Sequence, residues 1–440
     1  MIVAGWGNYP RAETRMLAAF GPGDAARFAG AEASLIARGA GKAYGDAAIG
    51  ADATLSLRSL DRFIAFDPER KLLTVEAGVT LAAVIDAMLP RGFFPPVVPG
   101  TMLLTIGGLV AANAHGKNHH LAGGFGNHIE SLTLVQADGQ SITCSATENA
   151  ELFRATIGGM GLTGIITTVT LRVMAVETPF IRQELIAAPN LDALFRAFEE
   201  SKDWTYTVAW TDCLAGGSAR GRSIFFRGEH ALVSEVDPAR TMPRALELKR
   251  HALPLDFPSF TMNHLSARAF NELTWQNGRY RQGPSIIGWD KYFFPLDAIA
   301  NWNRVYGRRG FVQHQFVVPK ARGRDALGEV LSIMAARNAP ACLAVLKLLG
   351  PDEAGMLSFP MEGYTLAVDF PATPSVLKLL DELDAVVRAY NGRLYLAKDS
   401  RQSRETFEGG YPQLNAFRDL RRAAGAASRF RSLQSDRLGI

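Results

Sequence analysis

Apolar and polar positions alternate differently in the two halves of this chain. From about residue 35 to residue 173, short apolar runs are separated by glycine-rich turns. Runs of this length, bounded by glycine, predict β-strands rather than helices. The sequence therefore predicts an α+β domain with strands at 72–76, 132–137, 141–144 and 165–173.

One helix is expected among these strands. Thr80 can cap its first turn, because a threonine oxygen accepts a hydrogen bond from a backbone N–H at a helix start. The apolar positions that follow recur at helical spacing, at Leu81, Val84, Ile85, Met88 and Leu89. We expect this face to lie in the core.

The second half of the chain predicts another sheet-and-helix domain. Helical stretches alternate there with strand candidates, the helices at 191–200, 324–337 and 375–390 and the strands at 206–211, 223–226, 313–318, 344–349 and 364–370. The segment 256–288 is aromatic-rich, contains prolines and glycines, and has no clear period. It is expected to be a long, irregular and mobile excursion.

The composition is that of a folded globular protein. The 440 residues allow two or three compact domains, and the apolar share of 48% is too high for a disordered chain. The 47 basic and 43 acidic residues give a net charge of +4, with no block of lysine and arginine. Nucleic acid is therefore not an expected ligand.

The cysteines and the N-terminal residues indicate in which cellular compartment the protein is expected. Cys144, Cys213 and Cys342 are far apart and form no CxxC pair, so neither a disulfide framework nor a cysteine zinc site is expected. The first nine residues lack the pattern of a signal peptide, and no apolar run is long enough to cross a bilayer. We expect a cytoplasmic or peripherally membrane-associated protein.

A glycine-rich stretch at 38–46, RGAGKAYGD, follows an apolar run. Closely spaced glycines let successive backbone N–H groups converge on an anion such as phosphate. The spacing GxGxxxG does not match the nicotinamide fingerprint GxGxxG, and Ala43 stands where a Walker loop needs serine or threonine after the lysine. Alone, the stretch is equally consistent with an ordinary glycine turn.

Two further stretches offer bare backbone. The first, 99–120, contains Gly107, Gly108, Ala111, Ala112 and Ala114, and the second, 157–164, has the sequence IGGMGLTG. Small residues allow a backbone to approach a large flat ligand closely. Three such loops in one domain are hard to explain by turns alone.

Metal binding is the competing interpretation of His115, His119 and His120. Glycines at 116, 123 and 124 argue against a regular helix that would place two of these histidines on one face. No acidic or cysteine ligand stands nearby in the sequence. We therefore predict no metal site.

Together, several motifs resemble the decaprenylphosphoryl-β-D-ribose 2′-oxidase family. They are RGAGKAYGD, PGTMLLTIGG, AHGKNHH, GGFGNHI, ELFRATIGGMGLTGII and GRLYLAKDSR. The PGT and IGG elements are typical of the wider group of flavoenzymes with a vanillyl-alcohol-oxidase-like fold, whereas HGKNHH and AKDSR are narrower. The resemblance implies a two-domain, PCMH-type FAD-binding fold, with an FAD domain at 1–173 completed by 395–440 and a substrate domain at 174–394.

The resemblance also implies the cofactor contacts. FAD is expected to bind at Arg38, Gly39, Ala40, Gly41, Lys42, Ala43, Tyr44, Gly45, Pro99, Gly100, Thr101, Thr105, Gly107, Gly108, Ala112, Asn113, His115, Gly116, Asn118, Gly161, Gly164, Ile165 and Lys398. In some relatives a histidine of the first loop is joined to the flavin. The loop here has no histidine, so we expect dissociable FAD.

Catalytic and substrate positions follow from the same resemblance. The catalytic candidates are Lys398, His115, Tyr44 and Lys117, and the proton acceptor among them stays open. By the resemblance, Lys398 lies beside the flavin, where a cation stabilises the reduced ring. The substrate candidates are Trp210, Gln313, Gln315, Lys347 and Asp369. Their alternatives are a core aromatic for Trp210, surface amides for the glutamines, and an exposed strand lysine for Lys347.

The implied reaction is FAD-dependent oxidation of a secondary hydroxyl on a polyprenyl-phosphate-linked pentose to a keto sugar. A separate short-chain, NADH-dependent keto-reductase would complete an epimerisation used in cell-wall glycan synthesis. The main alternative is an FAD-dependent oxidase of a soluble polyol or sugar lactone. A flavin-binding or metal-binding protein without turnover is the alternative from another class.

Overall fold

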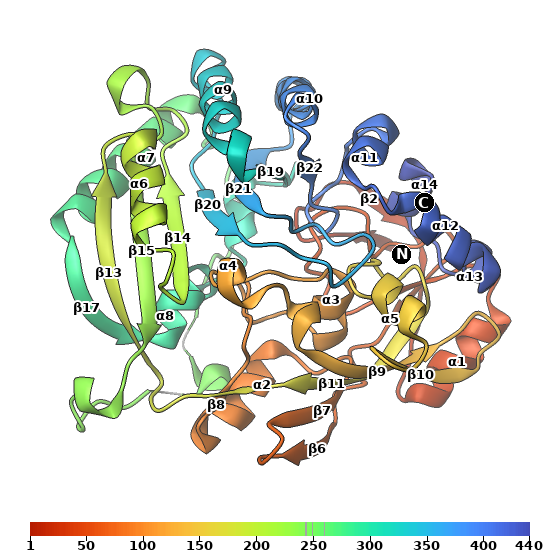
Figure 1. The fold of residues 1–440 in the computed structure, drawn as a ribbon. Helices are drawn as coiled ribbons and strands as arrows, with labels where there is room; N and C mark the ends of the chain where they lie inside the picture. The colour runs from red at the N-terminus through yellow and green to blue at the C-terminus, as the bar shows by residue number, and fades with distance from the viewer. Residues whose placement is uncertain (243, 249, 259) are drawn as a thin grey trace.

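The computed structural model describes residues 1–242, 244–248, 250–258 and 260–440. The described chain has an α+β fold in which two bodies of sheet and helix face each other across a cavity (Figure 1). Both termini lie at the right of this view, in the first body. The second body, at the left and top, is built around the longest sheet.

The first body contains a five-stranded antiparallel sheet and a three-stranded parallel one among the described residues. The larger sheet has the order β10-β9-β11-β7-β6, with β6 (Phe63–Asp67), β7 (Leu72–Glu76), β9 (Ile129–Val135), β10 (Ser141–Ser145) and β11 (Ile165–Arg172). The smaller has the order β3-β5-β4, with β3 (Arg15–Ala18), β4 (Ile36–Arg38) and β5 (Ala53–Ser56). The strands predicted from residue 72 to residue 173 are confirmed, with end shifts of a few residues.

Short elements complete this body. They are β1 (Ile2–Ala4), β2 (Arg11–Glu13), β8 (Phe93–Phe94), β12 (Met174–Ala175), α1 (Pro22–Ala31), α2 (Leu81–Met88), α3 (Ile106–Ala111), α4 (His119–Ala122) and α5 (Ala150–Thr156). Helix α2 confirms the predicted cap, since the Thr80 side chain accepts the Ala83 N–H at 3.2 Å. Its predicted apolar face is buried in the core.

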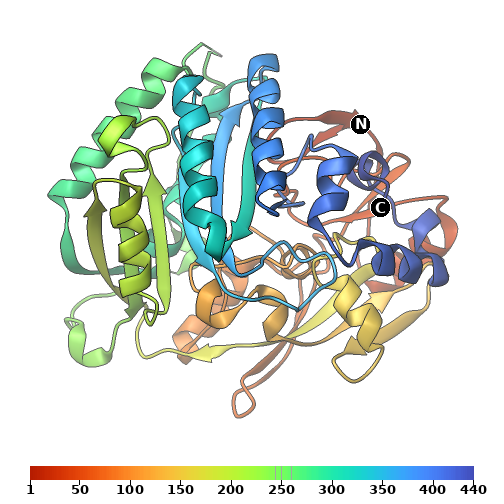
Figure 2. The same ribbon diagram turned by 45° about the horizontal axis from the view of Figure 1, so that its top comes forward.

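The second body is an eight-stranded sheet with the order β17-β13-β15-β14-β20-β21-β19-β22 among the described residues. Its strands are β13 (Phe180–Ala188), β14 (Tyr206–Thr211), β15 (Ser223–His230), β17 (Gly283–Gly288), β19 (Phe311–Pro319), β20 (Ala344–Leu349), β21 (Gly363–Pro371) and β22 (Arg393–Leu394). Helices α6 (Leu191–Glu200), α9 (Gly323–Ala336) and α10 (Pro374–Ala389) cover one face, and Figure 2 shows them in front of the strands. The predicted strands and helices of this half are confirmed.

Side-chain alternation along β19 gives the sheet two different faces. Val312, Phe316 and Val318 pack in the core beneath the helices. Gln313 and Gln315 point the other way and line the cavity, which confirms the prediction that they share a face. The face without the three helices is therefore the polar wall of the cavity.

The prediction of an irregular segment at 256–288 is wrong. Most of it forms α7 (His264–Tyr280) and β17, while residue 259 lies outside the described residues. Apolar side chains occur on both the buried and the exposed side of α7, so the sequence shows no helical period there. The neighbouring elements are β16 (His251–Ala252), α8 (Trp289–Phe293) and β18 (Ile299–Ala300).

The C-terminal segment returns to the first body. It forms α11 (Arg404–Gly410), α12 (Leu414–Ala423), α13 (Ala426–Arg429) and α14 (Leu433–Leu438). Leu35 N–H donates to Arg429 O at 2.8 Å, and Arg431 N–H donates to Leu35 O at 3.0 Å. On these contacts we propose that 395–440 completes the domain formed by 1–173, and that 174–394 forms the other.

One buried ion cluster joins the two ends of the chain. Arg437 on α14 lies 2.9 Å from a carboxylate oxygen of Asp46 and 2.9 Å from one of Asp399. The two carboxylate side chains are 5% and 2% exposed, respectively, and that of Arg437 is 27% exposed. One guanidinium therefore pairs with two carboxylates that are almost completely buried.

Replacing Arg437 by alanine should lower the free energy of unfolding by about 3 kcal/mol, because it leaves two buried carboxylates without their cation. Urea unfolding of the purified protein measures the change. The matched control is Arg431→Ala, which removes a more exposed pair with Asp436 in the same segment. The control substitution should lower the free energy of unfolding by less than about 1 kcal/mol. Equal losses in the two variants would contradict the prediction.

Candidate active site

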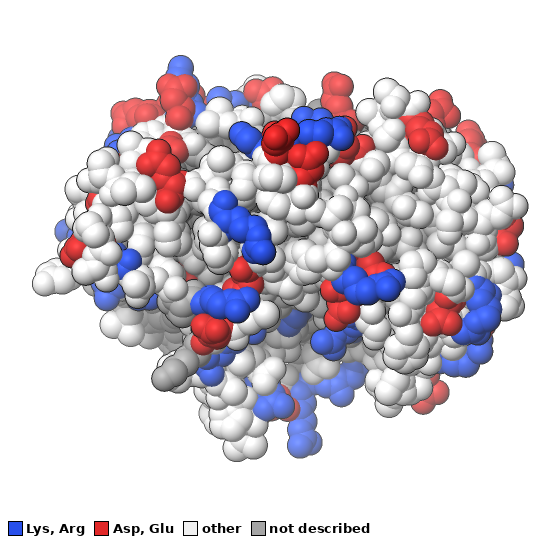
Figure 3. All heavy atoms as spheres, turned by 90° about the horizontal axis from the view of Figure 1, so that it is seen from below, with Lys and Arg blue, Asp and Glu red and all other residues white. Residues whose placement is uncertain are grey.

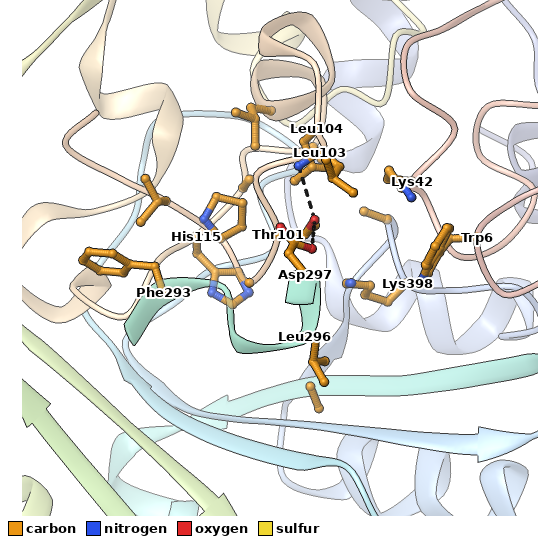
Figure 4. Close-up of a pocket in the computed structure, with 18 of the residues that line it drawn as sticks. Trp6, Lys42, Thr101, Leu103, Leu104, His115, Phe293, Leu296, Asp297 and Lys398 are labelled. Carbon is orange, nitrogen blue, oxygen red and sulfur yellow. Dashed lines mark hydrogen bonds between the residues drawn. The ribbon is translucent and has the colours of Figure 1, made fainter. Parts of the chain in front are cut away.

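The two bodies enclose a cavity of about 1250 Å³. Loops of the first body line one side, and the polar face of the eight-stranded sheet lines the other. Figure 4 shows Lys42 and Lys398 on one side of this space and His115 with Phe293 on the other. The cavity is large enough for a cofactor and a substrate together.

The three small-residue loops meet at this cavity. Its wall includes Gly39 to Tyr44, Pro99 to Thr101, Thr105, Gly107, Gly108, Ala112, Gly161 and Gly164. Gly41 and Gly161 have φ values of 65° and 77°, a conformation that favours glycine. A Cβ on Gly39 would lie 2.1 Å from the Thr105 hydroxyl oxygen, so larger residues cannot fit where the loops touch. Bare backbone therefore faces the cavity, as a large flat ligand with phosphates requires.

Six of the predicted cofactor positions are not on the described cavity wall, and their contact with FAD stays a prediction. Arg38 donates to Ala4 O and Ala48 O, and so braces the first loop. Gly45 packs against Asp399 O, and Ile165 points into the core while Ile166 lines the cavity. The described cavity wall also lacks Asn113, Gly116 and Asn118.

Asn113 and Asn118 make hydrogen bonds that support the loop 113–120, the histidine loop. Asn113 donates to Asp352 at 3.0 Å and to Ser358 at 2.9 Å, and its oxygen accepts Gly126 N–H. Asn118 donates to Pro96 O at 2.7 Å. Gly116 lies against Val98, where a Cβ would come within 3.0 Å of the backbone. These residues shape the wall from behind.

His115 is buried at the seam between the two bodies. The Gln315 amide donates to its Nε2 at 2.9 Å, and its ring packs against Phe359 and Tyr395. Burial lowers the pKa of His115 well below its ordinary value, and the nearby Lys347, His119 and Lys398 lower it further. The imidazole is therefore neutral at physiological pH.

The neighbouring histidines have structural partners. His119 Nδ1 accepts Gly350 N–H, and its Nε2 donates to Asp352 at 3.2 Å. His120 donates to Trp204 O at 3.0 Å. Asp352, far away in sequence, is thus an acidic neighbour that sequence spacing could not reveal. No group of three or more potential metal ligands occurs within the described residues.

Lys398 lies where two sequence motifs meet. Tyr44 N–H donates to Ala397 O at 2.9 Å, which joins the first glycine loop to the AKDSR motif. The Lys398 Nζ then sits 3.6 Å from the centroid of the Tyr44 ring. Burial lowers the pKa of Lys398, Asp369 opposes this shift, and Lys347 adds to it. Burial raises the pKa of Tyr44 well above its ordinary value, so its phenol stays protonated.

Lys117 and Lys347 are the other buried cations of the site. Lys117 Nζ donates to Tyr292 O and lies 4.2 Å from the Tyr292 ring centroid. Burial lowers the pKa of Lys117 to about 7 and that of Lys347 to about 8. Lysines in this state bind an anion readily, because an incoming negative charge compensates for the lost hydration.

All the predicted substrate residues line the cavity. Gln313 donates to Asp369 at 2.5 Å, and burial raises the pKa of this carboxyl. Trp210 lies on the same wall and donates to Cys342 O at 3.3 Å. The arrangement offers amide, carboxyl and ammonium groups to a ligand with several hydroxyls.

Sequence reasoning missed Asp297, which accepts hydrogen bonds from Thr101 Oγ1 at 2.7 Å and Met102 N–H at 2.8 Å. It pins the PGT loop to the second body, as Figure 4 shows. Further lining residues that were missed are Arg250, Tyr280, Arg281, Lys291, Tyr292 and Phe293. Tyr280 and Arg281 come from the segment 256–288, the other four residues flank it, and no local motif marks any of them.

Comparison with known proteins agrees with this geometry. Residues 24–145 match a family model described as an FAD binding domain. The chain is 35% identical over 414 residues to the decaprenylphosphoryl-β-D-ribose oxidase of Mycolicibacterium smegmatis, covering 92% of this chain and 89% of the relative. This chain belongs to the decaprenylphosphoryl-β-D-ribose oxidase family.

Other relatives are more distant or partial. An uncharacterised Streptomyces coelicolor protein is 33% identical, covering 82% of this chain and all of the relative. The L-gulonolactone oxidase of Mus musculus is 29% identical over 33% of this chain and 34% of its own length. As a member of the decaprenylphosphoryl-β-D-ribose oxidase family, the protein is an FAD-dependent oxidoreductase with a PCMH-type fold. The glycine-lined wall fits FAD, because its loops present backbone to a flat, phosphate-bearing ligand.

Acid denaturation should release intact FAD into the supernatant, because the first loop, 38–46, contains no histidine to form a bond to the flavin ring. Flavin absorbance of the supernatant and the mass of the precipitated chain check this. A chain heavier by one FAD would refute the prediction. As an internal control, the apoprotein should regain the flavin spectrum when FAD is added back after a gentler release.

Proposed function

We propose that this enzyme oxidises a secondary hydroxyl of a polyprenyl-phosphate-linked pentose to the keto sugar. Its relative from Mycolicibacterium smegmatis is named for a lipid-linked ribose. The observation that carries the proposal is the charge of the cavity. Two acidic side chains, Asp297 and Asp369, line it together with basic residues at Lys42, Lys117, Arg250, Arg281, Lys291, Lys347 and Lys398.

The cavity carries more positive charge than the pyrophosphate of one FAD would balance. The FAD pyrophosphate accounts for part of the charge near the glycine loops. Lys117 and Lys347 lie by the sheet wall, and each is buried with a lowered pKa. A neutral lactone or polyol would leave them without a counter-ion, whereas a sugar phosphate supplies one. The charge therefore favours a phosphate-bearing substrate over a soluble lactone.

The polar wall can hold the sugar ring. Gln313, Gln315 and Asp369 offer donors and acceptors on one face, so a pentose can be oriented by its hydroxyls. FAD, when bound, supplies the acceptor for the hydride that leaves the carbinol carbon. The hydroxyl proton needs an acceptor in the same space, where Lys398 and Lys117 have lowered pKa values.

We assign Lys398 the role of a cation beside the reacting centre. Its ammonium lies over the Tyr44 ring at the glycine-loop side of the cavity. A buried cation there stabilises negative charge that develops during oxidation. His115 is neutral and held by Gln315, so it packs and orients rather than carrying charge.

Two wider expectations accompany the reaction. The keto product has to be reduced again for a net epimerisation, and the chain lacks a nicotinamide fingerprint at its glycine loop. We therefore propose a separate short-chain, NADH-dependent keto-reductase as a partner in cell-wall glycan synthesis. Because the substrate carries a polyprenyl chain, we also propose a cytoplasmic or peripheral membrane location.

Anaerobic flavin reduction tests the substrate class. A polyprenyl-phosphate pentose should bleach the flavin absorbance, whereas xylitol and gulonolactone at the same concentration should leave it unchanged, because they lack the phosphate that Lys117 and Lys347 would bind. Bleaching by the lactone or the polyol, with none by the lipid-linked sugar, would establish the alternative substrate class.

Changing Lys398 to alanine should retain FAD but slow flavin reduction by roughly 10²- to 10³-fold, because one preorganised charge is lost. Stopped-flow absorbance at saturating lipid-linked sugar measures the rate. Lys378→Ala, at an exposed position of α10, is the matched control and should not change it. Equal rates in the two variants would remove Lys398 from the chemistry.

The pH profile separates the roles of this lysine. Because the pKa of Lys398 is lowered, raising the pH from neutral to alkaline removes its proton. If the cation assists, the wild-type rate falls over that range and the fall is absent in Lys398→Ala. A rate that rises over the same range would instead identify Nζ as the proton acceptor.

A further inference from the structure

We propose that one surface of the second body docks onto an anionic lipid bilayer, with the cavity mouth turned toward the lipid. This surface, the apolar face, consists of Leu255, Phe257, Phe260, Leu265, Leu273 and Tyr280. The inference rests on the proposed function, because a lipid-linked substrate has to reach the cavity from a membrane. None of the helices in the described part of the chain is long and apolar enough to cross that membrane.

The side chains of the apolar face are unusually exposed for their size. Phe260 is 77% exposed, Leu255 74% and Leu273 71%. All six belong to a stretch of 26 residues, 255–280, that includes α7. Clustered apolar side chains on a surface mark a binding site for another protein or for lipid.

Helix α7 carries apolar side chains on both its buried and its exposed side. Ala267, Asn271, Trp275 and Gly278 are buried, and the Trp275 ring packs with Leu185 and Ile224 of the sheet. Leu265, Leu273 and Tyr280 recur at helical spacing on the opposite side. Polar residues such as Glu272 and Arg279 are also exposed, so these three large apolar side chains stand among polar ones. Figure 2 shows α7 as the long green helix along the left edge of the molecule.

The segment that carries the apolar face meets the wall of the cavity at both ends. At one end, Tyr280 itself lines the cavity, as does Arg281. At the other end, β16 pairs with β18, whose Ile299 and Ala300 line the cavity. Phe257 N–H then donates to Arg304 O at 2.9 Å and holds its segment beside this pair. A lipid chain that leaves the cavity beside Tyr280 would therefore meet the apolar face.

Charge identifies the occupant as an anionic bilayer. Residues 240–310 contain 11 basic and five acidic residues, a net charge of +6 in a chain whose total is +4. Arg250, Arg281 and Lys291 of this range line the cavity. Seen from below, the molecule carries basic and acidic side chains over most of its face, with basic ones more frequent in the lower middle (Figure 3). Basic and apolar residues together favour the interface of an anionic membrane.

A second copy of the chain fits this surface less well. Two copies joined through the apolar face would bring like charges of the same basic range together, which opposes association. Lipid head groups carry the opposite charge and need no matching shape. The apolar side chains can then enter the boundary of the acyl chains.

Vesicle flotation of the full-length, FAD-loaded protein tests the proposal. The protein should float with vesicles of phosphatidylcholine containing phosphatidylglycerol, float poorly with phosphatidylcholine alone, and dissociate as salt is raised. The double variant Phe260→Ser, Leu273→Ser should bind the anionic vesicles at least roughly tenfold more weakly, because two apolar side chains no longer enter the lipid.

The control is the double variant Phe20→Ser, Ile64→Ser, which removes exposed apolar side chains of the first body. It should bind vesicles like the wild type. Both double variants should oxidise a short-chain, water-soluble polyprenyl-phosphate pentose at the wild-type rate, since neither changes a residue that lines the cavity.

The outcomes separate the two hypotheses. A wild type that oxidises the lipid-linked sugar but does not float, or variants with equal flotation, would overturn the docking surface alone. Flotation that depends on Phe260 and Leu273 without oxidation of the sugar would overturn the proposed function and leave the docking surface standing. A wild-type dimer in sedimentation velocity that the Phe260, Leu273 variant dissociates, with no flotation, would show instead that the face joins two copies.

Discussion

The active site depends on a buried polar seam between the two bodies. On the first body this seam is the loop 113–120, and on the second it includes Gln315, Asp352 and Thr207. Gln315 donates to His115, Asp352 accepts from both Asn113 and His119, and Thr207 N–H donates to Lys117 O at 2.9 Å. Buried polar groups without partners cost roughly 1–3 kcal/mol each, so these bonds specify one relative placement.

That placement sets the electrostatics of the cavity. Because both walls exclude water, lysines from different bodies share a poorly hydrated space, and their pKa values fall. Lys398 comes from the C-terminal motif, Lys117 from the histidine loop and Lys347 from β20. A flavin and a phosphate-bearing sugar are the anions that such a space favours. Cofactor binding and substrate choice therefore depend on the same seam.

The second body serves the site in a different way from the first. Its sheet gives one face to the core beneath α6, α9 and α10 and the other to the cavity. The segment that follows β15, residues 231–310, adds basic side chains to the wall of the cavity and apolar side chains to the surface beside it. The first body contains the part of the chain that matches an FAD binding domain, and the second adds the basic and apolar side chains on which the proposed substrate entry rests.

The sequence by itself determined the features that arise from local chemistry. Thr80 and the spacing after it specified α2, alternation put Gln313 and Gln315 on one face, and the glycine loops marked a flat phosphate-bearing ligand. Resemblance of short motifs then pointed to FAD and to Lys398. These signals act within a few residues, so they can be read without knowing the fold.

Only the tertiary structure decided what depends on distant partners. Asp297 accepts a hydrogen bond from Met102, 195 residues earlier in the chain, and Asp352 accepts one from Asn113, 239 residues earlier. Nothing beside either aspartate in the sequence indicates these contacts. The hydrogen bonds by which Arg38 braces the first glycine loop, to Ala4 O and Ala48 O, likewise depend on the folded chain. Helix α7 escaped prediction because its exposed side carries large apolar side chains among the polar ones. Periodicity identifies a helix only when one side faces water and the other the core.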